Sequence, residues 1–311
     1  MTQPTISRRA ALAGFATTAL GTSTLGAAQE ANAKIGLGFS LYGLPKWSLS
    51  DGIKLCAATG YDSVELVLMS TYPSEPKQLS KSARAALRKQ LADSKLNVSG
   101  LMDNLPVQAD EAKHREQLDR IKAAAELAHE LAPNAPPPLE TIIGGKPGQW
   151  DEFKQLATDR IAEWARIAEQ AKLVVCVKPH AGGALNRPED AIALVRQIDS
   201  PWLRLVYDYS HYEHRGMSLA DTMRELLPFC PFVHVKDRVA DTSKLQFLLP
   251  GEGSTDYTDY ARLLASHGYR GHVVVEVSAQ IHGRPDYDPR RAVQRSYDVL
   301  AAAWKRAGVG R

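Results

Sequence analysis

The stretch VVCVKPHAGG, residues 174–183, starts as an apolar run and ends in polar residues and glycine. Short apolar runs with β-branched residues are typical of strands in a parallel sheet that is covered on both faces. Lys178 and His180 follow this run directly. A lysine and a histidine that follow a buried strand lie at the carboxyl end of that strand. In α/β proteins, ligand sites lie at the carboxyl ends of the parallel strands.

The pattern of this stretch repeats along the chain. Strands are predicted at 35–42, 63–67, 97–102, 139–143, 174–178, 203–208, 232–236 and 272–277. Helices are predicted between and after them, at 48–59, 80–94, 111–131, 151–171, 188–198, 218–227, 256–266 and 289–305. Eight strands alternating with eight helices in 311 residues predict an α/β fold, a (β/α)8 TIM barrel. A doubly wound sheet would need a glycine-rich phosphate loop after an early strand, and the sequence has none there.

The first 33 residues differ from the rest. Arg8 and Arg9 precede an uncharged segment rich in Ala, Gly, Thr and Leu, and a small-residue cleavage site ends at Ala33. This order predicts a signal peptide at 1–33 and one barrel domain at 34–311. The paired arginines resemble a twin-arginine signal, so we expect a periplasmic or secreted protein. A plain Sec signal or an N-terminal anchor is the alternative.

Charge and cysteine content restrict the partners. The net charge of +3 gives no electrostatic footprint for nucleic acid. After the signal, no stretch reaches the roughly 20 apolar residues that a membrane span needs. The chain has three cysteines that lie far apart in the sequence: Cys56, Cys176 and Cys230. We expect buried thiols, and one disulfide bond in an oxidising compartment is the alternative.

Ionisable side chains recur at the predicted carboxyl ends of the strands. In a barrel these ends converge on one opening, where active sites lie. The residues concerned are Glu65, Asp103, Lys146, Lys178, His180, Asp208, His211, His234, Lys236, Asp237 and Glu276. Three of them, Asp208, His234 and Glu276, are expected to point at the same axis.

Three motifs on successive strands carry a resemblance to a known family. They are DYSH at 208–211, HVKD at 234–237 and VVVE at 273–276. In this order they resemble the xylose-isomerase-like sugar isomerase/epimerase superfamily, and the resemblance covers almost all of residues 35–305. The loop GEG at 251–253, followed by Asp256, also matches a loop of that superfamily.

The resemblance implies one divalent metal ion, Mn, Mg, Zn or Co, bound by side chains of strands five to eight. Asp208, His234 and Glu276 match the metal ligands of the last three of these strands. In this family two glutamates move a proton on the carbon beside a carbonyl group, and the metal stabilises the resulting oxyanion. The chain departs from the pattern at Lys178, where a cation that cannot ligate while protonated replaces the glutamate of strand five.

Two outcomes are open for Lys178. It takes the metal's place and pairs with Asp208 or Glu276, or the metal stays with a substitute ligand such as His180 and a Lys178 of depressed pKa acts as a base. We expect the Lys178 nitrogen within ion-pair distance of Asp208 or Glu276. By the alternation of the strand, Cys176 should lie beneath the lysine, and His180 should face the substrate cleft above it.

The predicted function is an exported sugar isomerase or epimerase, or a lyase of the same family, that acts by proton transfer next to a carbonyl group of a small carbohydrate. The alternative is a non-catalytic or metal-independent carbohydrate-binding barrel that has lost the strand-five glutamate. DNA repair by a metal cluster is disfavoured by the export signal and the weak charge. The expected catalytic residues are Glu276, Lys178, His180 and His211, and the expected substrate-binding residues are Glu65, Trp150, Lys236 and Asp237.

Overall fold

The structure, a computed structural model, describes residues 34–239 and 245–311, so the predicted signal at 1–33 lies outside the described residues. Eight parallel strands close into a barrel in the order β1-β10-β7-β6-β5-β4-β3-β2. This confirms the predicted (β/α)8 fold. The strands are β1 Gly36–Ser40, β2 Ser63–Val67, β3 Asn97–Asn104, β4 Leu139–Ile142, β5 Val175–Val177, β6 Leu203–Tyr207, β7 Phe232–Val235 and β10 His272–Val275.

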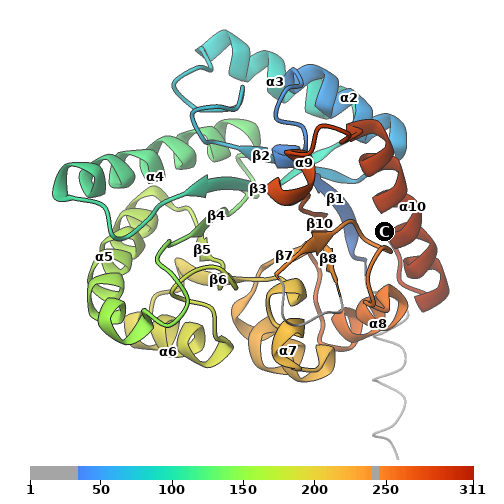
Figure 1. Cartoon of the computed structure of the whole chain (residues 1–311). Helices are drawn as coiled ribbons and strands as arrows, with labels where there is room; N and C mark the ends of the chain where they lie inside the picture. The colour runs from blue at the N-terminus through green and yellow to red at the C-terminus, as the bar shows by residue number, and fades with distance from the viewer. Residues whose placement is uncertain (1–33, 240–244) are drawn as a thin grey trace, which may run out of the picture.

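The helices form a ring outside these strands (Figure 1). They are α2 Leu49–Thr59, α3 Lys81–Asp93, α4 Glu111–Leu131, α5 Trp150–Ala171, α6 Pro188–Ile198, α7 Leu219–Leu226, α8 Tyr257–Ser266 and α10 Pro289–Ala307. Local sequence fixes several of their ends. The side chains of Ser48, Ser80 and Asp110 accept hydrogen bonds from backbone N–H groups in the first turns of α2, α3 and α4. Gly60 ends α2 at a φ of 108°, a left-handed conformation that glycine adopts readily.

The interior of the barrel is filled by a small apolar layer that is separate from the main core between strands and helices. This lower layer comprises Cys176, Val206, Phe232 and Val274. Gly100 leaves room for it, because a Cβ atom there would lie 2.6 Å from the ring of Phe232. Two residues further along each strand, the next side chains point inward at the carboxyl end of the barrel.

Three short elements at this end are absent from the prediction. β8 Asp237–Arg238 pairs antiparallel with β9 Phe247–Leu248, and α9 Ala279–His282 follows β10. Two-residue strands and a four-residue helix are too short to leave a periodic hydrophobic pattern in the sequence.

The predicted buried thiols are confirmed, because all three cysteines are free and buried. In the part of the chain that the structure describes, no helix is long and apolar enough to cross a membrane.

Candidate active site at the carboxyl end of the barrel

A cleft of about 350 Å³ opens at the carboxyl ends of the strands. Its volume falls within the range of about 300–1,000 Å³ that is usual for small-molecule sites. Four ionisable residues line it together with His180: they are Glu140, Lys178, Lys236 and Glu276. Another hollow, of about 360 Å³, lies outside the barrel against α4, where Asp103 and Arg120 already pair with each other. We place the candidate site in the barrel cleft because the strand-end groups converge there.

Lys178 points into the barrel, as predicted. Its Nζ atom lies 2.9 Å from Oε1 of Glu276, 3.0 Å from Nδ1 of His234 and 3.5 Å from Oε1 of Glu140. Burial alone would lower the pKa of Lys178, but the carboxylates of Glu140 and Glu276 outweigh it and raise the pKa above its ordinary value. These contacts favour a protonated Lys178 paired with Glu276 over a Lys178 of depressed pKa that acts as a base.

Lys236 holds the second pair of carboxylates. Its ammonium group is hydrogen-bonded to Oδ2 of Asp208 and lies 2.5 Å from Oε2 of Glu276. The other oxygen of Asp208, Oδ1, accepts a hydrogen bond of 2.6 Å from the hydroxyl of Ser210. Both oxygens of Glu276 are thus bound to ammonium groups, one from Lys178 and one from Lys236.

The glutamate between the two lysines is a weak base. Burial would raise the pKa of Glu276, but the charges of Lys178 and Lys236 hold it well below its usual range. Asp208 behaves in the same way, because Lys236 and His211 outweigh its burial and lower its pKa. Both carboxylates therefore remain ionised.

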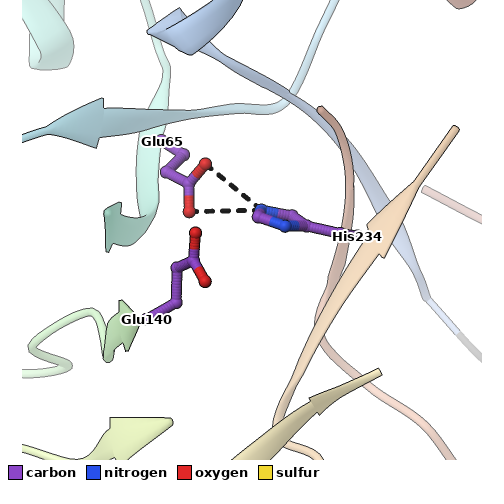
Figure 2. Close-up of side chains that lie close together, drawn as sticks. All are labelled: Glu65, Glu140 and His234. Carbon is purple, nitrogen blue, oxygen red and sulfur yellow. Dashed lines mark hydrogen bonds and ion pairs between the residues drawn. The ribbon is translucent and has the colours of Figure 1, made fainter. Parts of the chain in front are cut away.

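Figure 2 shows Glu65, Glu140 and His234 pointing toward one another from β2, β4 and β7. Nε2 of His234 lies 3.2 Å from each oxygen of Glu65. An ammonium group can only donate, so Lys178 donates to Nδ1 of His234, and the imidazole keeps its proton on Nε2 and donates it to Glu65. His234 thus connects Lys178, at the bottom of the cleft, to the buried carboxylate of Glu65.

Glu140 is the one carboxylate of this group with an unused oxygen. Within residues 34–239 and 245–311, its buried Oε2 atom has no hydrogen-bond partner. Burial raises the pKa of Glu140 to about 7, although Lys178 acts in the opposite direction. A carboxyl group of this kind can both accept and release a proton near neutral pH.

His180 and His211 lie next to each other, with ring centroids 4.3 Å apart. His180 lines the cleft, as expected, whereas His211 is fully buried and accepts a hydrogen bond from the backbone N–H of Ala181. Burial lowers the pKa of His180 well below its usual range and that of His211 to about 4. Both imidazoles are therefore neutral at physiological pH.

Three predicted substrate-binding residues are not brought to the cleft. Asp237 follows Lys236 and points the other way, because successive side chains in a strand alternate. Its carboxylate accepts hydrogen bonds of 2.8 Å from the N–H groups of Gly251 and Gly253, so it shapes the GEG loop. Trp150 packs on Phe153 at the start of α5, and Glu65 is fully buried below the cleft floor. Lys236 does line the cleft, as predicted.

Sequence reasoning missed Glu140. The signal was present in LETI at 139–142, where a carboxylate interrupts a short apolar strand. A buried strand carries such a residue only if other side chains compensate its charge, and these come from β5 and β7, far away in the sequence. Phe247 and Gln280, which also line the cleft, belong to the short elements that the pattern did not predict.

Comparisons with known proteins agree with this architecture. Residues 53–303 match the family model described as a xylose isomerase-like TIM barrel. An inosose dehydratase of Clostridium tetani is 24% identical over 206 residues, which cover 61% of this chain and 66%, just under two thirds, of that protein.

Two solved structures share the fold at low sequence identity. A 3-keto-D-glucoside 4-epimerase from E. coli superposes with a TM-score of 0.66 at 16% identity, covering 88% of this chain and 100% of the other. The IolI protein with a bound zinc atom gives a TM-score of 0.69 at 19% identity, covering 88% and 98%. The named relatives include a dehydratase and an epimerase, which supports an enzyme of this barrel family.

The described residues include two groups that could supply metal ligands. These are Glu65 with Glu140 and His234, and Asp208 with His211 and Glu276. The four-ligand site implied by the family pattern does not fit, however. Lys178 stands in place of one ligand and donates to Nδ1 of another, and Lys236 binds one oxygen each of Asp208 and Glu276.

Proposed function

Because the chain belongs to the xylose isomerase-like TIM barrel family, we propose that it is an enzyme that removes a proton from the carbon next to the carbonyl group of a keto sugar or a sugar derivative. This step begins isomerisation, epimerisation and dehydration alike. The dehydratase and epimerase names among similar proteins support the proposal.

The observation that carries the proposal is that a fixed ammonium group, that of Lys236, and the carboxyl group of Glu140 line the same cleft. Lys236 is held by Asp208 and Glu276, and Glu140 has an unbonded oxygen. When the C–H bond breaks, Glu140 accepts the proton, the C–H electron pair forms a carbon–carbon double bond, and the carbonyl electron pair moves onto the oxygen. Lys236 stabilises that oxyanion without reorganisation, because its position is already fixed.

The fate of the enolate decides the reaction class. Return of the proton to the opposite face gives epimerisation. Return to the neighbouring carbon, with transfer of the adjacent hydroxyl proton to the oxyanion, gives isomerisation. Loss of a hydroxyl group from the next carbon gives dehydration. His180, a neutral imidazole on the cleft wall, is the proposed second proton carrier for each of these outcomes.

Glu276 has a different role in this proposal from the proton acceptor expected from the family pattern. Its oxygens hold Lys178 and Lys236, so it positions the ammonium groups. In both roles Glu276→Gln lowers turnover, and full turnover of this variant would exclude both. The roles differ in pH dependence: the Gln variant keeps a titration near neutral pH if Glu140 is the acceptor.

Exchange of substrate hydrogen for deuterium tests the proposal. Keto sugars and inososes are incubated with the protein in D2O and followed by NMR, which detects enolate formation whatever the product. We expect exchange at the carbon beside the carbonyl group for at least one substrate class. Glu126→Gln, an exposed change on α4, serves as the control that keeps full exchange. Carbohydrate binding without exchange on any substrate would favour the non-catalytic binding barrel instead.

The proposed location is the periplasm or the extracellular space. The Arg8-Arg9 pair and the small-residue site ending at Ala33 support it. N-terminal sequencing of protein from the native host should find a start near Lys34. A start at Thr2 would contradict export with cleavage.

A further inference from the structure

We propose that the ammonium groups of Lys178 and Lys236 replace the divalent metal ion in this barrel, so that the cleft works without bound metal. The inference rests on the proposed function for its chemistry, but its structural half concerns the side chains alone.

The first argument is the position of Lys178. Its nitrogen lies 3.0 Å from Nδ1 of His234 and 2.9 Å from Oε1 of Glu276, so it takes a lone pair from each of two residues that match family ligands. A metal ion bound to Nδ1 would lie about 2.0–2.1 Å from that atom. An ion at that distance along the same lone pair would overlap the ammonium group. Lys178 and the ion therefore exclude each other.

The second argument is that Lys236 occupies the remaining oxygens. It binds Oδ2 of Asp208 and Oε2 of Glu276, while Oδ1 of Asp208 is bound by Ser210. No oxygen of these two carboxylates is left without a donor in the described part of the chain. With Lys178 in place, a metal ion would therefore find no free oxygen on either carboxylate.

The third argument is charge. Exchanging a carboxylate for an ammonium group at position 178 raises the charge of the site by two units. That is the charge a divalent ion would bring. The buried carboxylates thus receive from the lysine the compensation that a metal would otherwise supply.

Lys236 also has the position that an electrophile requires. It lines the cleft, with its ammonium group 5.0 Å from the centroid of the Phe247 ring. Lys178 also lines the cleft, and its contacts with Glu276 and His234 hold these two side chains in place. The two lysines thus share the two roles of a metal ion. Lys236 binds the substrate oxygen, and Lys178 fixes the positions of Glu276 and His234.

Metal content and metal titration test the inference independently of activity. Wild-type protein is purified with Zn²⁺ or Mn²⁺ in the growth medium, analysed by mass spectrometry, and titrated calorimetrically with each ion. We expect substoichiometric metal and no specific binding. Lys178→Glu, which supplies the missing carboxylate, should bind about one equivalent, at least about tenfold tighter than the matched control Lys178→Gln.

Stoichiometric metal in the wild-type protein would overturn the inference, including metal held by the deeper group of Glu65, Glu140 and His234. If Lys178→Glu does not fold, the wild-type metal content decides alone. Deuterium exchange that survives a chelator supports the inference, and exchange that a chelator abolishes and Zn²⁺ or Mn²⁺ restores contradicts it. Absence of both exchange and metal would refute the proposed function and leave the replacement of the metal by lysine in place.

Discussion

Two successive layers of the barrel interior lie on the same four strands yet differ completely in chemistry. The lower layer is Cys176, Val206, Phe232 and Val274, and the upper layer, two residues further along each strand, is Lys178, Asp208, His234 and Glu276. Both layers are almost fully buried. The lower layer gains stability from each side chain separately, through apolar burial. The upper layer is tolerated only as a set, because each charge needs its partners.

The largest expected effect concerns function in the upper layer. Glu140→Gln keeps the shape of the side chain but removes the proton acceptor. We expect deuterium exchange to fall by about 10²–10⁴-fold. The measurement is the exchange rate by NMR, with Glu126→Gln as the reference. An unchanged rate would show that another group takes the proton.

The next effect concerns stability and separates the two layers. Lys178→Met leaves the buried carboxylate of Glu140 without its cation and leaves Glu276 with Lys236 alone, and it should cost about 3–5 kcal/mol. Val206→Ala in the lower layer should cost about 2 kcal/mol, mainly through lost apolar contact. Urea unfolding measures both free energies.

A double-mutant cycle sharpens the same contrast. The double variant Lys178→Met/Glu276→Leu should recover part of the lost stability, with a coupling of about 0.5–3 kcal/mol, because the second change removes a carboxylate that the first left with one of its two cations. The pair Val206→Ala and Lys178→Met should be closer to additive. Equal coupling in both pairs would mean that the upper layer is not energetically distinct.

A smaller effect is expected from pH. The pKa of Glu140 is raised to about 7 in the folded protein, so the carboxylate forms as the pH rises through that value. The exchange rate should rise with pH up to about 7, and Glu140→Gln should lack this limb. Stability moves the other way, because the contribution of Glu140 is fully present below its unfolded pKa and is lost as the pH rises through the folded one. Thermal unfolding at pH 5 and pH 8 checks the sign against the Gln variant.

The smallest effect is expected at Cys176. Cys176→Ala removes one sulfur atom from the lower layer and should cost about 1 kcal/mol, with unchanged exchange. A large loss of exchange would show that the lower layer positions the cleft residues and does not merely fill the barrel.

The fold could be predicted because its signals are local. Apolar strands and helical spacing alternate along the chain, and capping residues such as Ser48 and Gly60 mark the ends of α2. The alternation of side chains in a strand also placed Lys178 above Cys176 and toward the axis. These inferences require only the sequence close to each residue.

The site was harder to predict because its partners are distant in sequence. Glu140 meets Lys178 across β4 and β5, and His234 meets Glu65 across 169 positions. Asp237 resembled a site residue by its motif, but its direction depended on where β7 ends. Sequence motifs identify which residues gather at the barrel opening. Which side chains pair with each other, and how deeply each is buried, depends on how the barrel closes.

The lysine at the end of β5 also has a genetic consequence. The codons of lysine and glutamate differ only in their first base. One point mutation at position 178 therefore replaces the ammonium group by a carboxylate. Each form compensates the same buried carboxylates, one with a side chain and the other with an ion from the surroundings. Under the proposed replacement of the metal by lysine, this single mutation exchanges a charge supplied by the chain for one supplied by an ion, with no intermediate that lacks both.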